Sequence, residues 1–253
     1  MKIQTWVLTI SLCSGCGAEG LDPEAGLNQA GQQQSALSNK DFDVGFTGCT
    51  EFAGIGFVPA ENARPLVPEP YALAGDAQSA IAVVRVASCQ DAIVDGKSVG
   101  PTRTSQIGIM LAGGDATADI NNYTVAYVTN QARLHARLQG AGLTTDKSDA
   151  IRLLLAGTTL TATSTNFQIT GSAAVPTSAP TTFVASWWAD GRHGTVQSRT
   201  VFPDIRFGSA STTLTTPSSS ELGALLDATT LTFPILDSYN AFATAHLEVR
   251  ISD

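Results

Sequence analysis

Short runs of apolar and β-branched residues fill the chain from Asp41 onward, and clusters of Gly, Pro, Asn and Asp separate them. This pattern is typical of strands joined by turns. Asp95-Gly96 and Asp190-Gly191 each lie between two such runs and predict tight hairpins. The predicted strands are Val44–Thr47, Thr50–Val58, Ile81–Ala87, Ala92–Val94, Ser105–Leu111, Tyr123–Val128, Thr158–Thr163, Phe167–Gly171, Phe183–Ala189, Gly194–Val201, Ser211–Thr215 and Ala245–Ile251.

Three copies of the string Thr-Thr-Leu-Thr begin at Thr158, Thr212 and Thr229. Alternation of threonine with leucine gives a strand one polar face and one apolar face. We therefore interpret the copies as strands with one face in water, and not as units of a repeat protein.

A first helix is predicted over Gln131–Gln139, where Leu134 and Leu138 share a face at i, i+4. Asn130 is the expected N-cap, and Gly140 and Gly142 are expected to end the helix.

A second, shorter helix is predicted over Ser220–Leu226, capped by Ser218 or Ser219. The segment Pro59–Pro70 contains four prolines and predicts an irregular or extended crossing. Ten or more strands with two short helices indicate a mostly β, β-rich α+β domain with a curled or barrel-like antiparallel sheet, spanning residues 41–253.

The first residues have the layout of a secretory signal, with Lys2 before a short apolar run and small residues. Cys16 follows Ser14-Gly15, which resembles the lipidated end of a bacterial lipoprotein signal, so residues 1–16 are predicted to be a signal peptide with Cys16 as the lipid attachment site. Cys13 departs from the leucine preferred there, and cleavage after Ala18 with secretion is the alternative. The apolar run is shorter than the roughly 20 residues needed to span a bilayer.

Residues 17–40 are polar and poor in large apolar side chains, which predicts a flexible tether between the anchor and the domain. The expected location is therefore the cell envelope, in the periplasm or on the outer surface, with the membrane as a partner through the N-terminal lipid.

The charge pattern excludes several functions. The net charge is −8, only 14% of residues are charged, and no block of Lys or Arg is present, so nucleic acid is not an expected partner. The three histidines, His135, His193 and His246, fall on a predicted helix, a hairpin turn and a terminal strand. We predict no metal and no cofactor.

Either processing route leaves two cysteines in the domain, Cys49 and Cys89. In an oxidising compartment these two favour one disulfide over two buried free thiols.

The most distinctive stretch is Trp187-Trp188, followed by Asp190 and by Arg192-His193 at a predicted turn. Neighbouring side chains on a strand point to opposite faces, so one tryptophan is expected in the core and the other at a cavity or under a loop. Both are candidate pocket residues, although the pattern favours the simpler interpretation, a core tryptophan beside an exposed hairpin tip.

Three segments carry a resemblance to the acetoacetate decarboxylase-like superfamily. They are Gly48-Cys49-Thr50-Glu51-Phe52, then Arg64-Pro65 with Pro68 and Tyr71, then the apolar run Ile81–Val86 that contains Arg85. The resemblance covers most of residues 44–251 and implies a curled antiparallel sheet around an apolar cavity. It makes Glu51, Arg64, Arg85 and Lys97 candidate pocket residues, with Arg103 as a further polar group.

The activity of that superfamily does not carry over by the same residues. Its decarboxylases use a buried lysine as a Schiff-base nucleophile. Beyond the tether this chain has only Lys97, next to a predicted turn, and Lys147, in a polar stretch between acids. No carboxylate lies in Ser105–Ile109, where the resemblance places an acidic strand.

No catalytic motif with a nucleophile elbow, zinc-binding helix or phosphate loop is present. The sequence favours a non-catalytic, envelope-anchored β domain able to bind a small apolar ligand. Two alternatives stay open: a cavity enzyme of decarboxylase-like ancestry with an altered mechanism, and a structural or interaction protein that uses Thr-rich outer strands.

Overall fold

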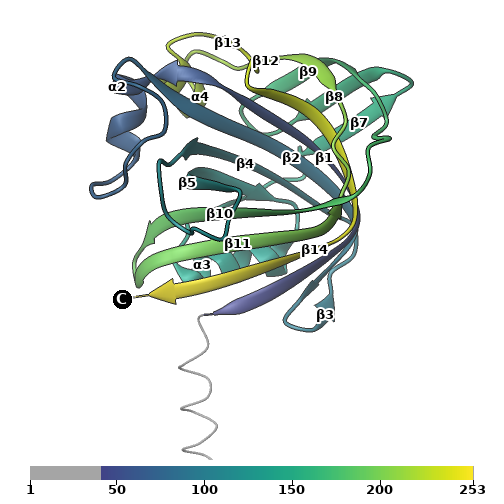
Figure 1. Ribbon diagram of the computed structural model, residues 1–253. Coiled ribbons are helices and arrows are strands. Elements are labelled where there is room, and N and C mark those ends of the chain that lie inside the picture. The colour runs from purple at the N-terminus through teal and green to yellow at the C-terminus, as the bar shows by residue number, and fades with distance from the viewer. Residues whose placement is uncertain (1–40, 253) are drawn as a thin grey trace, which may run out of the picture. The chain divides into compact units, whose positions relative to one another are not determined.

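The computed structural model describes residues 41–252, and the predicted signal peptide, Cys16 and the predicted tether lie outside these residues. Seven strands form a closed barrel in the order β1, β14, β11, β10, β5, β4 and β2, with β2 pairing back to β1 (Figure 1). The prediction of a mostly β, barrel-like sheet is confirmed. The barrel strands are β1 (Phe42–Pro59), β2 (Ser79–Val94), β4 (Thr102–Met110), β5 (Ile120–Thr129), β10 (Thr181–Gly191), β11 (Gly194–Ile205) and β14 (Leu236–Ser252).

Two short strands pair with the C-terminal ends of barrel strands: β3 (Lys97–Ser98) pairs with β2, and β6 (Asp146–Lys147) pairs with β5. Asp95 and Gly96 connect β2 to β3 with positive φ angles of 49° and 70°, the conformation that a two-residue hairpin turn requires. The second hairpin differs from its prediction, because Asp190 pairs with Thr195 inside the ladder and the turn is made by Arg192 and His193.

A second, five-stranded antiparallel sheet lies against the outside of the barrel (Figure 1). Its inner face contributes leucine and isoleucine to a core shared with β1, β2 and β4, while most of its threonines face outward and Thr212 is buried beside Leu214. All three Thr-Thr-Leu-Thr strings supply strands of this sheet, as predicted. In spatial order the strands are β13 (Thr230–Thr232), β12 (Ala210–Thr215), β9 (Gln168–Ala173), β8 (Thr159–Thr163) and β7 (Arg152–Ala156).

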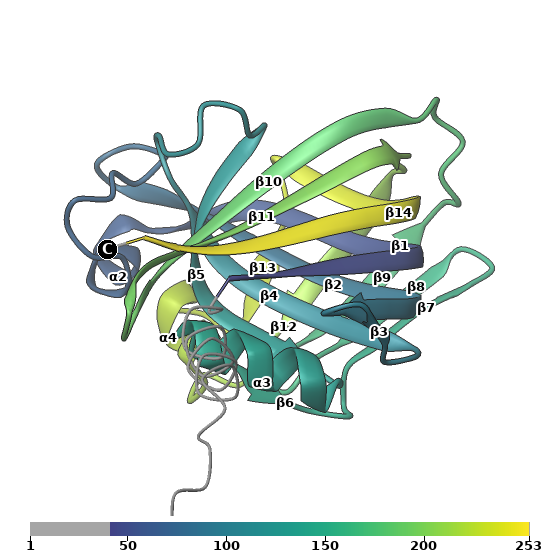
Figure 2. The same ribbon diagram turned by 90° about the horizontal axis from the view of Figure 1, so that it is seen from below.

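Helix α3 (Ala132–Ala141) lies beside β6 and buries Leu134 and Leu138 in the barrel core (Figure 2). It ends at Gly142, which has a left-handed φ of 106°. The expected cap was wrong: Asn130 instead accepts a hydrogen bond from the Arg103 backbone N–H, and no side chain caps the helix.

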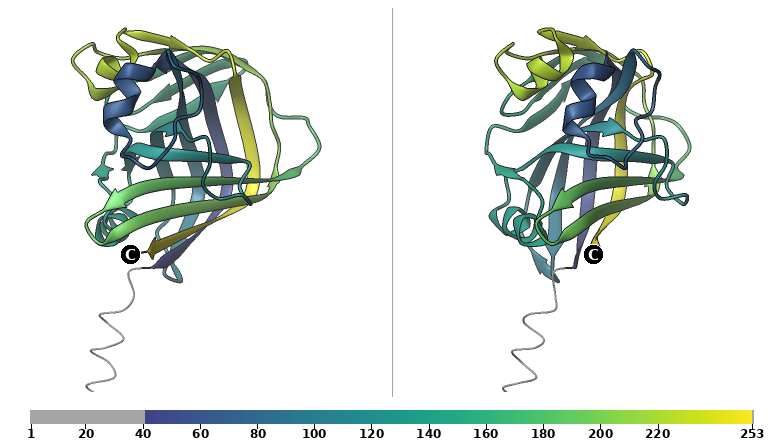
Figure 3. Two further views of the ribbon diagram at one scale, coloured as in Figure 1. Left: turned by 60° about the vertical axis from the view of Figure 1, so that its left-hand side comes forward. Right: turned by 90° about the vertical axis from the view of Figure 1, so that its left-hand side faces the viewer.

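Helix α4 (Glu221–Leu226) covers the outer core and is capped by Ser220, whose Oγ accepts from the Gly223 N–H at 2.9 Å. The predicted caps, Ser218 and Ser219, lie two residues and one residue too early. A helix that was not predicted, α2 (Ala60–Ala63), continues into the 3-10 turn η1 (Arg64–Leu66) and lies beside α4 (Figure 3). Proline is compatible with the first turn of a helix, and Pro65 occupies that position in η1.

The described residues have two hydrophobic cores, one between the barrel wall and the second sheet and one inside the barrel. Within residues 41–252 no helix has the length and apolar character needed to cross a bilayer.

Candidate functional site

A layer of polar side chains crosses the barrel interior at one level. Glu51 on β1, Arg85 on β2 and Gln106 on β4 point inward because their neighbours Phe52, Val84 and Ile107 belong to the outer core. The strand register places these three side chains at the same height in the barrel. Arg85 pairs with Gln106 on one side and with Ala53, two residues from Glu51, on the other. The sequence alternation therefore collects an acid, a base and an amide inside an apolar barrel.

Each of the three guanidinium nitrogens of Arg85 donates a hydrogen bond within this layer. Its Nε donates to Glu51 Oε2 at 3.0 Å, its Nη1 donates to Gln106 Oε1 at 2.9 Å, and its Nη2 also contacts Glu51 Oε2. The side chains of Arg85 and Glu51 are 13% and 7% exposed, and the Phe202 ring lies 5.6 Å from the guanidinium carbon. The two charges neutralise each other within the barrel, as buried charges require.

A cavity of about 230 Å³ lies on one side of the polar layer. Glu51, Arg85 and Asn240 are its polar lining residues. Four of its apolar lining residues are half-buried: Ile120, Phe183, Phe207 and Leu236. Its remaining lining residues are Ala53, Ile55, Val83, Ala185, Trp187, Phe202 and Ile205.

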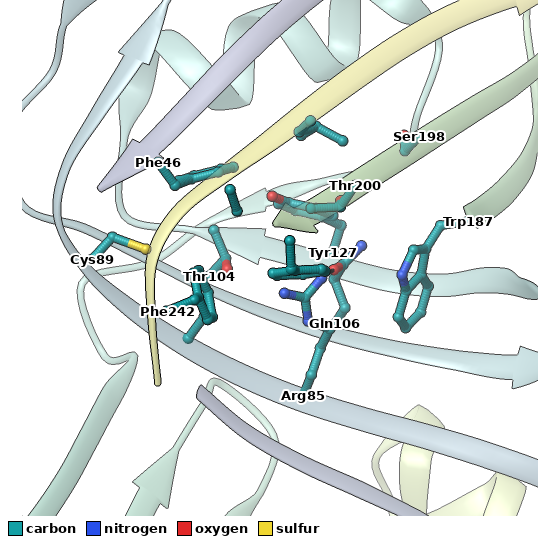
Figure 4. A pocket seen from close by; sticks show the side chains of 14 residues that line it. Phe46, Arg85, Cys89, Thr104, Gln106, Tyr127, Trp187, Ser198, Thr200 and Phe242 are labelled. Carbon is teal, nitrogen blue, oxygen red and sulfur yellow. Dashed lines mark hydrogen bonds between the residues drawn. The ribbon is translucent and has the colours of Figure 1, made fainter. Parts of the chain in front are cut away.

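A smaller space of about 20 Å³, close to the volume of one water molecule, lies on the other side of the layer (Figure 4). Tyr127, Thr104, Ser198 and Cys89 contribute to its lining. Burial raises the pKa of Tyr127 to about 12, although Arg85 and a hydrogen bond with Thr104 act in the opposite direction. The Tyr127 phenol therefore stays protonated near neutral pH.

Several buried polar atoms at the two spaces have no hydrogen-bond partner among the described residues. Both side-chain atoms of Asn240, the indole Nε1 of Trp187 and the Oγ of Ser198 are in this state. Asn240 is 1% exposed and Trp187 is 2% exposed. An unpaired buried donor or acceptor costs about 1–3 kcal/mol, so these atoms favour a bound molecule that completes them.

The sequence-predicted pocket residues divide into two groups. Glu51, Arg85 and Trp187 come together in the barrel interior. Trp188 points to the opposite face, where its Nε1 donates to Asn121 Oδ1 at 3.1 Å. Arg64 lies outside the interior and binds backbone carbonyls of its own loop, including Tyr71 O at 2.9 Å.

The lysines of residues 41–252, Lys97 and Lys147, are exposed on the short strands β3 and β6. Neither belongs to the lining of the two interior spaces. The Lys97 side chain therefore does not supply a Schiff-base nucleophile to the barrel.

Cys49 and Cys89 form the predicted disulfide between β1 and β2, where they are direct partners in the register. Both side chains are buried, and Cys89 lines the smaller space. The bridge thus fixes two barrel strands two residues away from Glu51.

Gln106, Tyr127 and Asn240 are among the interior residues that were not predicted. Gln106 and Tyr127 lie in predicted strands. In a closed barrel, side chains along each strand alternate between the interior and the exterior, and this alternation would have placed both residues inside. Asn240 had no such signal, because the first half of β14 was not recognised as a strand.

A second polar cluster, around Asp115, is structural. Asp115 accepts hydrogen bonds from the Thr117 hydroxyl at 2.6 Å, Ser186 Oγ at 3.0 Å and Arg199 Nε at 3.2 Å. These bonds, led by the Thr117 hydroxyl, lower the pKa of the Asp115 carboxyl to about 2. The cluster joins the loop after β4 to β10 and β11, and no group of three metal-binding side chains occurs in the part of the chain that the structure describes.

Solved structures with this architecture include two acetoacetate decarboxylases. An acetoacetate decarboxylase aligns with a TM-score of 0.57 and 13% identity, covering 83% of this chain and 88% of that one. Acetoacetate decarboxylase from Legionella pneumophila aligns with a TM-score of 0.56 and 11% identity, covering 94% and 98% of the two chains.

No protein-family model matches the sequence, and no curated protein matches it. The fold of residues 41–252 is therefore acetoacetate decarboxylase-like, which agrees with the resemblance in the sequence, and the likeness extends to the fold alone.

Proposed function

We propose that this domain binds a small, mainly apolar molecule inside its barrel. The observation that carries the proposal is the cavity of about 230 Å³, which joins a largely apolar wall to three polar residues at one end. Ligand sites commonly combine an apolar lining with a few placed polar groups. The Asn240 amide and the Trp187 indole N–H have no hydrogen-bond partners among the described residues, so hydrogen bonds to them would orient such a ligand.

A substitution that fills the cavity with a larger side chain tests this proposal. Ala53 lines the cavity and is half-buried, so Ala53→Trp places an indole in the space that the ligand needs. Toluene, indole and benzamide would be titrated into the full chain by calorimetry. We expect saturable binding of at least one probe to the wild type and a loss of at least tenfold in Ala53→Trp.

Ala156→Trp on the exposed face of β7 is the matched control and should bind like the wild type. No saturable binding of any probe, or equal binding by Ala53→Trp and the wild type, would contradict the proposal.

A cavity enzyme is the second candidate function. The observation that favours it is the buried pair of Glu51 and Arg85 inside an acetoacetate decarboxylase-like barrel. Such an enzyme would act without a lysine Schiff base, because Lys97 and Lys147 are exposed elsewhere. Acid–base chemistry by Glu51, with charge stabilisation by Arg85, is the mechanism that these residues allow.

Incubation with acetoacetate distinguishes the two candidates. An enzyme would release carbon dioxide, lose that activity in Glu51→Gln, and form no borohydride-trapped adduct that depends on Lys97. Absence of turnover with this and related keto acids would remove the enzyme candidate, whereas trapping on Lys97 that Lys97→Ala abolishes would overturn the lysine-free mechanism.

We also propose that the domain is exported and held at a cell-envelope membrane by a lipid on Cys16. The signal-like start of the chain and a disulfide that suits an oxidising compartment support this location. Metabolic labelling with a fatty acid should mark the wild type, and Cys16→Ser should lose the label and move to the soluble fraction. An unlabelled wild type cleaved after Ala18 would support secretion instead.

A further inference from the structure

Asn240 stands out among the residues that line the larger cavity. It lies on β14 directly opposite Glu51 of β1, and its side chain is 1% exposed. Neither Oδ1 nor Nδ2 has a hydrogen-bond partner among the described residues. A primary amide buried in this way has lost its water and gained nothing in return, which is unfavourable unless another molecule completes it.

From these contacts we infer that the ligand carries a neutral carboxamide or lactam, which pairs with the side-chain amide of Asn240. This inference rests on the proposed binding function. An asparagine side chain presents one acceptor and one donor edge in a single plane. A carboxamide or lactam presents the complementary acceptor and donor, so both Asn240 atoms are satisfied by one planar group.

Other polar groups of similar size fit less well. An ester or ketone accepts from Nδ2 but leaves Oδ1 unpaired. A carboxylate has acceptors only and directs a lone pair at Oδ1, while an undissociated acid has the correct pattern but is scarce near neutral pH.

The charge balance of the cavity also disfavours an anion. Three of the Arg85 hydrogen bonds go to Glu51 and Gln106, so its charge is already paired. The Glu51 carboxylate is the register neighbour of Asn240, and a ligand carboxylate there would lie close to a like charge. A neutral amide leaves the Glu51–Arg85 pair intact.

Trp187 also lines this cavity, as well as the smaller space, and its indole N–H is likewise without a partner among the described residues. It favours a ligand with an additional acceptor, such as the second lone pair of an amide carbonyl. The apolar wall formed by Phe183, Phe202 and Ile205 suits the hydrocarbon part of the ligand.

Three probes of one shape test the inference: benzamide, benzoate and toluene, titrated into the full chain at neutral pH. The expected result is that benzamide binds at least tenfold more tightly than benzoate or toluene. In Asn240→Leu the advantage of benzamide over toluene should disappear while toluene still binds. Asn166→Leu, on an exposed loop, should behave like the wild type.

Tighter binding of benzoate than of benzamide, or an unchanged advantage of benzamide in Asn240→Leu, would overturn the inference. If toluene binds and benzamide has no advantage, the amide inference fails and the proposed function stands. If no probe binds, both fail. If Asn240→Leu does not fold, NMR of the wild type replaces it. Benzamide should shift the side-chain NH₂ resonances of Asn240, and unchanged resonances at saturation would exclude the pairing.

Discussion

Glu51 and Arg85 are charged residues inside an apolar barrel, and their mutual contacts make that burial tolerable. Removing a charge from water costs several kcal/mol, which a close partner and further hydrogen bonds offset. Gln106 supplies the third contact to Arg85, and Phe202 packs against its guanidinium. Removal of either charged group would leave the other buried and unpaired.

Glu51→Ala is therefore expected to lower the free energy of unfolding by about 3–5 kcal/mol, as measured by urea denaturation. Asp43→Ala is the matched control, because its ion pair with Arg250 joins side chains that are 53% and 42% exposed and is worth about 1 kcal/mol or less. Equal losses in the two variants would show that Arg85 and Glu51 are not held in the buried contact.

Asp115 makes stability depend on acid pH. Its folded pKa of about 2 lies below the ordinary value of 3.8, so the folded state binds its proton less readily than the unfolded state. The contribution is present above about pH 4 and is lost as the pH falls toward 2. Asp115→Asn should flatten the fall in the unfolding free energy across this window, and a slope identical to that of the wild type would contradict the assignment.

At the level of elements, local sequence signals identified most strands well and the helix caps poorly. Strand alternation predicted most of β2 and four of the five strands of the threonine-faced sheet, and Asp95-Gly96 predicted the turn after β2, whereas β7 was not predicted. The helix α2 was missed because the prolines after it suggested an extended chain, although Pro65 fits a first helical turn. Ser220 was passed over because three serines in a row offer no local means of choosing the cap.

Ser220→Ala removes the hydroxyl that accepts from the Gly223 N–H and should destabilise the domain by about 1 kcal/mol. Ser219→Ala removes a hydroxyl with no capping bond to α4 and should stay within about 0.5 kcal/mol of the wild type. A larger loss in Ser219→Ala than in Ser220→Ala, measured by thermal unfolding, would place the start of the helix earlier than the structure does.

At the scale of the whole molecule, the sequence predicted a curled sheet and the 49–89 disulfide but not the full interior. The first half of β14 contains Asp237, Ser238 and Asn240, which are poor strand formers. Pairing with β1 on one side holds that segment extended, and such long-range pairing leaves no local signal. The inward position of Asn240 therefore became visible only in the closed barrel.

The Cys49–Cys89 disulfide joins residues 40 apart and constrains the unfolded chain. In the chain-entropy model, replacing both cysteines with alanine should lower the unfolding free energy by about 4 kcal/mol. The wild type unfolded in the presence of a reductant should match the double variant. A difference of less than about 1 kcal/mol between the oxidised protein and the variant would mean that the bridge does not limit the unfolded state.

We expect the barrel to enclose a largely apolar space which a small molecule can enter. A crystal structure determined under xenon pressure tests it most directly, because xenon enters apolar cavities and produces strong density there. We predict a xenon site among Phe183, Phe202, Ile205 and Leu236, next to Trp187. An interior without xenon, filled by ordered water or by repacked side chains, would contradict the claim.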